Sequence, residues 1–366
     1  MPMPAPEHHP AATPMRRQEF EMLPVDARAL LAELPVVHLA GILDDGTPVL
    51  RTVNSVVVDD WVAFHSAPRG EKTGLVGRQA VLCAEENVAM APSTFFDAQK
   101  ACPATTYYRS VQVAGVIEEI TEPSQKARVL QALMEKLQPE GGHVPITADH
   151  PFYRGPVSGL LVAGIRLERI AGKAKLAQNR KPPEIAGLLT SLWRRGLPGD
   201  PRALEIIRAA NPDVPTPPFL TAPAGTTLHA WLPATAAAEA AELLADEYWN
   251  AGAFSRDEIA RAHAGGNPWV GARDGDGRLV ASARAISDGG KLAWIYDVIV
   301  ASAWRGRGLG QAVMTLILDH PAVRGARRVM LGTRDAQSLY ARFGFVDRDS
   351  LPPRGFATTE MVLVRA

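Results

Sequence analysis

The spacing of apolar positions near the start of the chain changes from helical to strand-like. Residues 26–34 have helical spacing, with Asp26 as the expected N-cap. Residues 35–67 hold three β-branched or apolar runs, which are separated at Asp45-Gly46 and at Asp59-Asp60. Because Asp-Gly favours tight hairpin turns, this pattern predicts consecutive antiparallel strands. His38 lies inside an apolar run and is most simply a core histidine.

The pattern stays mainly β up to residue 210. We expect strands at 79–87, 105–121 and 157–174, and helices at 124–137, 184–193 and 201–210. A stretch with five prolines, residues 211–226, follows and predicts an extended linker.

Beyond the linker, helical and strand-like patterns alternate. Helices are expected at 235–249, with Thr235 as the cap, at 255–266, with a capping box of Ser255 and Glu258, and at 335–343. Strands are expected at 267–274, 278–287, 291–300, 327–333 and 358–364. The chain therefore divides into a disordered leader (1–19), a mainly β domain (20–210), the linker (211–226) and an α/β domain (227–366).

Composition narrows the classes of function. The 366 residues include 46% apolar and 21% charged positions, with 39 basic and 39 acidic side chains. A chain with zero net charge has no overall basic field for nucleic acid or anionic lipid, so we expect neither as a partner. No apolar run is long enough to span a membrane, and the first residues lack a signal-peptide pattern. Cys83 and Cys102 are expected to be free thiols of a cytoplasmic protein.

A glycine-rich turn from Arg305 to Gly310 follows an apolar run and precedes a helix-like stretch. It lacks the lysine of a Walker loop, and Gln311 stands where a dinucleotide fingerprint needs its third glycine. Glycines let backbone N–H groups approach a pyrophosphate, whose negative charge a helix N-terminus favours. The turn therefore predicts a phosphate site, with simple turn residues as the alternative.

The turn and its surroundings resemble the GCN5-related N-acetyltransferase (GNAT) family over about residues 226–366. DVIVASAWRGRGLG (297–310) is similar to the family's acetyl-CoA strand and loop, and LGTRDAQSLYARFGF (331–345) is similar to the strand and helix that follow. The resemblance implies acetyl-CoA contacts from Val298, Ile299, Val300, Arg305, Gly306, Arg307, Gly308, Leu309 and Gly310. It also implies a small-amine pocket near Tyr248, Trp249 and Arg284.

Two residues of this region have implied roles in the chemistry. Tyr340 would protonate the leaving CoA thiolate, and Asp297 would accept the amine proton or bind a cationic substrate. The alternatives are a packing role for Tyr340, a structural carboxylate at Asp297 and a core role for Trp249. A non-catalytic acyl-CoA sensor would have the same fold.

The loop FHSAPRGEK (64–72) follows two strand-like runs and combines a hydroxyl, a glycine and two cations. Such groups suit one phosphate, although a solvated loop has a similar composition. The loop and the strand YYRSVQVAG (107–115) resemble the FMN-binding split-barrel family of the pyridoxamine 5′-phosphate oxidase type, over about residues 20–210. The nearest branch includes nitroimidazole-resistance proteins.

This second resemblance implies a split β-barrel, a homodimer with flavin at the subunit interface, and an oxidoreductase role. The implied FMN contacts are Arg51, Thr52, Val53, His65, Ser66, Lys72 and Ser110. A haem-binding barrel, or an empty barrel used for dimerisation, is the alternative. The expected protein is thus an acetyl-CoA-dependent acetyltransferase of a small amine, fused to an FMN-binding domain.

Overall fold

The computed structural model describes residues 15–265 and 268–351, and they form two compact units. The first unit consists of residues up to Leu192 together with Ala203–Pro215. The second consists of Trp193–Arg202 and the residues from Thr216 onward. Residues 193–202, which the sequence analysis assigned to the first domain, thus belong to the second unit. The strand expected at 358–364 and most of the expected leader lie outside the described residues.

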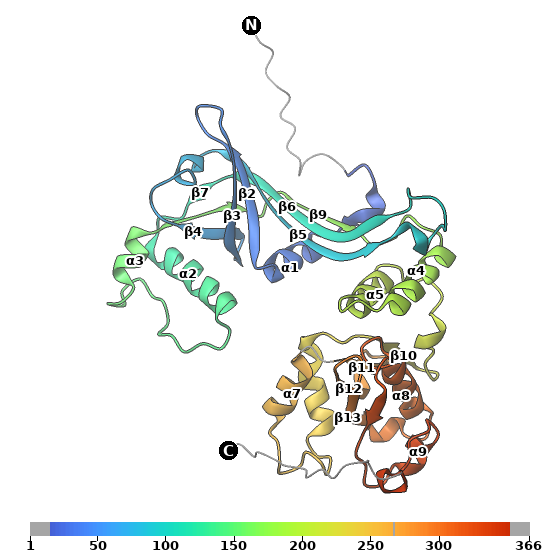
Figure 1. Ribbon diagram of the computed structural model, residues 1–366. Coiled ribbons are helices and arrows are strands. Elements are labelled where there is room, and N and C mark those ends of the chain that lie inside the picture. The colour runs from blue at the N-terminus through green and yellow to red at the C-terminus, as the bar shows by residue number, and fades with distance from the viewer. Residues whose placement is uncertain (1–14, 266–267, 352–366) are drawn as a thin grey trace. The chain divides into compact units, whose positions relative to one another are not determined.

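The first unit is built on a nine-stranded sheet in the order β1-β9-β6-β5-β2-β3-β4-β8-β7, and all its strand pairs are antiparallel (Figure 1). The strands are β1 (Glu21–Met22), β2 (Val36–Ile42), β3 (Pro48–Val58), β4 (Trp61–Ser66), β5 (Gln79–Ala91), β6 (Thr105–Val116), β7 (Glu118–Glu119), β8 (Leu161–Arg166) and β9 (Ile170–Lys175). The hairpins predicted at Asp45-Gly46 and Asp59-Asp60 are confirmed, because they join β2 to β3 and β3 to β4. The single strand predicted over 157–174 is wrong, since that stretch holds the end of a helix and two strands.

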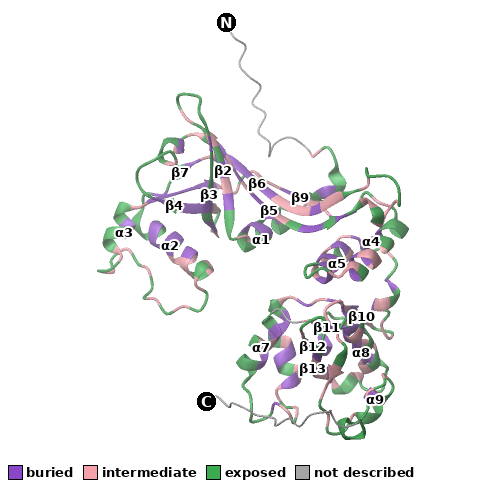
Figure 2. Ribbon diagram, in the orientation of Figure 1, coloured by how far each residue is buried: buried purple, intermediate pink, exposed green. Residues whose placement is uncertain are grey.

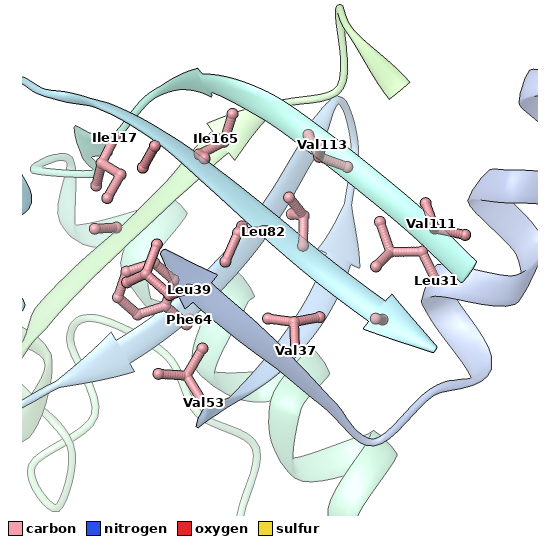
Figure 3. Close-up of a cluster of buried hydrophobic side chains, with 14 of the residues drawn as sticks. Leu31, Val37, Leu39, Val53, Phe64, Leu82, Val111, Val113, Ile117 and Ile165 are labelled. Atoms are coloured by element: carbon pink, nitrogen blue, oxygen red, sulfur yellow. The ribbon is translucent and has the colours of Figure 1, made fainter. Parts of the chain in front are cut away.

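Helix α1 (Pro24–Glu33) packs its apolar side into the core of this sheet. Leu30 and Leu31 lie with side chains from the central strands, and Figure 3 shows Leu31 beside Val111. Asp26 is not the N-cap as predicted, because the helix begins at Pro24. Proline suits the first helical turn, where its missing N–H has no intrahelical partner.

A second apolar cluster joins helix α2 (Pro123–Leu137) and helix α3 (Arg154–Gly159) to β3, β4 and β8. Buried and exposed positions alternate along α2 with helical spacing (Figure 2). Two further helices, α4 (Pro182–Arg195) and α5 (Asp200–Ala209), confirm the helices expected near 184–193 and 201–210.

His38 is not a core residue, contrary to the prediction from its apolar strand. Its side chain is 38% exposed, its Nδ1 lies 3.1 Å from the Thr52 hydroxyl, and its Nε2 lies 3.3 Å from a Glu85 carboxylate oxygen. The alternation along β2 explains the difference, because Val37 and Leu39 occupy the buried face and His38 the other.

The described part of the second unit has a five-stranded sheet in the order β10-β11-β12-β13-β14, in which β13 and β14 are parallel and the other neighbours in this order are antiparallel. Its elements are β10 (Thr226–His229), α6 (Ala237–Leu244), α7 (Arg256–Ala264), β11 (Trp269–Asp274), β12 (Leu279–Ser287), β13 (Leu292–Val300), α8 (Leu309–Asp319), β14 (Arg328–Met330) and α9 (Gln337–Ala341). The expected capping box of Ser255 and Glu258 is confirmed at α7, whereas Thr235 lies within a 3₁₀ turn and does not cap α6. The expected fold classes are both confirmed, mainly β and then α/β.

None of the helices that the structure describes is long and apolar enough to cross a membrane.

We expect Gly164→Ala to destabilise the first unit by about 1–3 kcal/mol, because overpacking a core typically costs this much. A Cβ on this β8 residue would lie 2.5 Å from the backbone oxygen of Val62 on β4, which cannot move away as a flexible side chain would. Gly187→Ala is the matched control, since Gly187 is an exposed residue of α4 with open space around it. Urea unfolding should show Gly164→Ala shifted to lower urea and Gly187→Ala unchanged or slightly stabilised; equal midpoints would contradict this packing.

Candidate functional site

Strand β13 loses its neighbour on one side partway along its length. It pairs with β14 only from Leu292 to Trp294, while its pairing with β12 continues to Val300. From Tyr296 on, the backbone groups that face away from β12 therefore have no strand partner among the described residues. The residues predicted to contact the pantetheine arm, Val298, Ile299 and Val300, all lie on this open edge.

A β-bulge in β13 accompanies the open edge. The register with β12 shifts so that Ser282 pairs with Ile299 but Arg284 pairs with Tyr296, which leaves two β13 residues opposite Ala283. One of them, Asp297, has a φ of +53°. Aspartate tolerates this left-handed region better than most residues, and a bulge bends the strand that carries it.

Two side chains hold the Asp297 carboxylate. The Arg284 Nε donates to one oxygen at 2.6 Å, and the Trp249 indole N–H donates to the other at 3.1 Å. The Arg284 and Asp297 side chains are 13% and 8% exposed, so the pair is largely removed from water. Because both oxygens already accept hydrogen bonds, the arrangement favours the structural interpretation of Asp297 over that of a proton acceptor.

A buried histidine that was not predicted from the sequence, His263, lies near the Arg284–Asp297 pair. His263 is 3% exposed, its Nδ1 lies 2.8 Å from the Ile259 carbonyl oxygen, and its ring packs edge-on against Trp269 at 5.0 Å. Burial lowers the pKa of His263; the hydrogen bond to Ile259 and the Asp297 charge oppose this shift, and the Arg284 charge adds to it. The imidazole is thus neutral near pH 7, when the Nδ1–H donates to Ile259.

The glycine turn has the backbone conformation that a phosphate loop needs. Gly306 and Gly308 have φ values of +77° and +84°, in the left-handed region where glycine avoids steric cost. Gly308 is also the N-cap of α8 and offers no side chain to the first N–H groups of that helix. Leu309 and Gly310 form the first turn of α8, so their N–H groups lie at its positive end.

The two arginines of the turn have different surroundings. Arg305 donates from Nη2 to Glu247 at 3.0 Å and from Nε to the Val300 carbonyl at 3.0 Å, so it fastens the turn to β13. Arg307 lies over the Trp304 ring at 4.9 Å and has no carboxylate partner among the described residues. Arg307 is therefore the better placed of the two for an anionic ligand.

Tyr340 is buried on α9, at 8% exposure, and packs edge-on to Phe345. Burial raises the pKa of Tyr340, and the nearby Tyr248 and Asp335 raise it further. Tyr248 accepts a hydrogen bond from the Arg334 backbone N–H at 2.9 Å and packs against Trp249 with ring centroids 4.8 Å apart. The structure thus brings Tyr340, Tyr248, Trp249, Arg284 and Asp297 close to one another, and their roles in catalysis and substrate binding stay predictions.

In the first unit, the loop after β4 also brings predicted residues together. Arg51 on β3 forms an ion pair with Glu71, which fastens the loop to the sheet. Partial burial and the charge of Lys72 lower the pKa of His65. Lys72 has no carboxylate partner in the described part of the chain, Ser66 at the end of β4 is buried, and Gly70 has a φ of +114°. A cation, a hydroxyl and an open backbone turn of this kind fit a phosphate group.

The other predicted flavin contacts, Thr52, Val53 and Ser110, do not form one group with Lys72. Thr52 lies beside His38, and Val53 is buried in the core, so only its backbone could touch a ligand. Ser110 on β6 is separated from β3 by β5 and β2 in the sheet, which is about 14 Å at ordinary strand spacing. A single chain therefore does not bring Ser110 to the loop that contains Lys72.

Comparison with known families assigns both units. Residues 25–174 match the model of the pyridoxamine 5′-phosphate oxidase family, and residues 229–345 match that of the acetyltransferase (GNAT) family. The chain joins one domain of each family. We call these the oxidase-like domain and the GNAT domain.

Individual relatives cover parts of the chain. Glucosamine 6-phosphate N-acetyltransferase 1 of Oryza sativa subsp. japonica is 32% identical over 74 residues, or 20% of this chain and 45% of that protein. A GNAT-family acetyltransferase structure from Xanthomonas campestris pv. campestris is 33% identical and covers 36% of this chain and 93% of its own, with a TM-score of 0.30. The FAD- and haem-binding protein of Mycobacterium smegmatis is 18% identical and covers 41% and 70%, with a TM-score of 0.35. The chain spans less than half of the first curated relative.

Two residues that hold parts of the GNAT site in place were not predicted from the sequence. Glu247 and His263 are not part of the glycine motif, and their contacts with Arg305 and Trp269 are apparent only in the fold. The only sequence signal was that Glu247 directly precedes Tyr248 and Trp249.

We expect Arg284→Met to destabilise the GNAT domain by about 3–5 kcal/mol, because removing one partner leaves a buried charge uncompensated. Arg256→Met is the matched control, since Arg256 pairs with Glu242 at the surface, where such pairs contribute at most about 1 kcal/mol. Urea unfolding should also show that adding Asp297→Asn to Arg284→Met recovers part of the loss. Equal losses in the two single variants would contradict the structural role of this pair.

Proposed function

We propose that the GNAT domain transfers an acetyl group from acetyl-CoA to a small amine. The observation that carries this proposal is the open edge of β13 beside a left-handed glycine turn that caps α8. Backbone groups of Val298 to Val300 would hold the pantetheine arm and polarise the thioester carbonyl. The N–H groups of the turn and of the first turn of α8 would bind the pyrophosphate, assisted by Arg307.

The reaction that follows needs a proton donor rather than a strong base. A neutral amine attacks the thioester carbonyl, the carbon–sulfur bond breaks as the tetrahedral intermediate collapses, and the amine proton passes to solvent. The Tyr340 hydroxyl donates a proton to the departing thiolate, and its raised pKa keeps it protonated at neutral pH. Asp297 acts as a positioning residue through the bulge, and Tyr248 and Trp249 form part of the wall beside Tyr340.

We expect Tyr340→Phe to lower kcat by about a hundredfold or more and to change KM for acetyl-CoA little, because general acid catalysis contributes about this factor. Release of CoA thiol would be followed with a panel of amino sugars, polyamines and amino acids that includes glucosamine 6-phosphate, the substrate in the name of one relative. Tyr153→Phe is the control, since its hydroxyl donates a hydrogen bond to the Val144 carbonyl in the oxidase-like domain. CoA binding without turnover of any amine would favour the acyl-CoA sensor instead.

We further propose that the oxidase-like domain binds FMN as a homodimer and serves as an oxidoreductase. Support for a dimer interface comes from the face of β2 and β3 that does not pack against the core. The apolar side chains of Ile42 and Leu50 on this face are 60% and 62% exposed. Ser66, Lys72 and the turn at Gly70 would hold the FMN phosphate, and His65 would lie beside it as a neutral ring. Bound FMN would supply the redox chemistry. Ser110 would then reach the flavin of the partner subunit.

We expect the purified protein to carry an absorbance band at about 450 nm, as flavoproteins do. Lys72→Gln should weaken FMN binding about tenfold, because it removes one charge-assisted phosphate contact of about 1.4 kcal/mol. Arg128→Gln, which removes a surface arginine paired with Asp59, is the matched control. A colourless protein that does not take up added FMN would leave the empty dimerisation barrel as the better account, and a haem spectrum would favour the haem-binding alternative.

A further inference from the structure

The oxidase-like domain has a second concentration of positive charge, away from the loop that contains Lys72. A cavity of about 360 Å³ lies where the start of β6 meets the end of β9. Five cationic side chains line it, and none of its lining residues is acidic. They are Arg16, Arg17, Lys173, Lys175 and Arg180. In a chain with zero net charge, such a group needs an explanation.

These cations are only partly neutralised by the protein. Arg180 lies 3.3 Å from Glu184 and over the Phe96 ring, and Lys175 donates to the Thr105 hydroxyl. Arg17 and Lys173 have no ion-pair partner among the described residues. Their mutual repulsion is a cost that an anion in the cavity would remove.

The lining also holds an unsatisfied polar group. Tyr107 is 1% exposed; Arg180 is the hydrogen-bond donor beside its hydroxyl oxygen, and the hydroxyl's own O–H has no acceptor among the described residues. Burial raises the pKa of Tyr107, and the charge of Arg180 and its hydrogen bond oppose that shift. A buried O–H without an acceptor is costly, so a ligand oxygen that accepts a hydrogen bond from it would stabilise the site. The next residue, Tyr108, presents its ring to the Lys173 and Lys175 ammonium groups at 5.5 and 5.9 Å.

We propose that this cavity binds a small molecule with two or more phosphate groups, of the size of a nucleoside diphosphate. Its volume lies within the range of small-molecule pockets, and five cations exceed what a single carboxylate needs. The cavity is lined by none of the residues predicted to hold the FMN phosphate at the Lys72 loop. The proposal therefore does not depend on flavin binding. The competing occupant is FMN of a partner subunit, because Ser110 pairs with Lys173 across β6 and β9.

A cysteine in the lining provides a local readout. Cys102 is exposed and lines the cavity, whereas Cys83 on β5 is half-buried and burial raises the pKa of its thiol. Iodoacetamide should therefore alkylate Cys102 first, and peptide mass spectrometry can follow each thiol separately. We expect ADP and inorganic pyrophosphate to slow alkylation of Cys102 at least tenfold and to leave Cys83 unaffected. Binding of ADP at the glycine turn of the GNAT domain would not produce this protection.

Charge-removing variants decide whether the protection arises in the cavity. Lys173→Gln should raise the ADP concentration for half-protection about tenfold. Lys173→Arg keeps the positive charge and should leave this concentration close to its wild-type value. Lys181→Gln is the matched control, because Lys181 is exposed, adjacent to Arg180 in sequence, and not part of the lining. Three results would overturn the proposal: no protection by either anion, equal effects of the Lys173→Gln and Lys181→Gln substitutions, or protection by FMN or a single-stranded oligonucleotide at lower concentration than by ADP.

Discussion

The geometry of the GNAT domain depends on one buried contact, in which Arg284 and Trp249 hold the carboxylate of Asp297. A residue other than glycine in the left-handed region costs on the order of 1–3 kcal/mol, and taking a carboxylate out of water costs more. The hydrogen bonds from Arg284 and Trp249 offset both costs. The bulge that they stabilise lies just beyond the last residue of β13 that pairs with β14. The exposed strand edge is thus a fixed feature of the fold.

The remaining parts of the site depend on the same group of side chains. Trp249 packs against Tyr248, Tyr248 receives the backbone N–H of Arg334, and the segment from Arg334 leads into the helix with Tyr340. Glu247, next in sequence, fastens Arg305 and with it the glycine turn. One short segment after α6 therefore links the open strand, the turn and the proton donor.

What the sequence could predict was local. The turn at Gly308, the capping box of Ser255 and the hairpin at Asp45-Gly46 each depend on residues that are neighbours in the chain. The partners of Asp297 are 13 and 48 residues away, and no spacing rule connects them. The cavity in the oxidase-like domain was missed for the same reason, because its cations come from both ends of that domain. The prediction for His38 was wrong for a different reason. Its apolar neighbours in the sequence did not determine which face of β2 it occupies.

Hydrogen–deuterium exchange with and without CoA tests the central claim most directly, because exchange reports individual backbone N–H groups. The full chain would be compared with and without a saturating concentration of CoA. We predict slowed exchange in peptides that cover residues 296–300 and 306–311, with no change in the strands of the oxidase-like domain. Unchanged exchange on β13 together with protection elsewhere in the GNAT domain would contradict the assignment of the open strand edge as the CoA site.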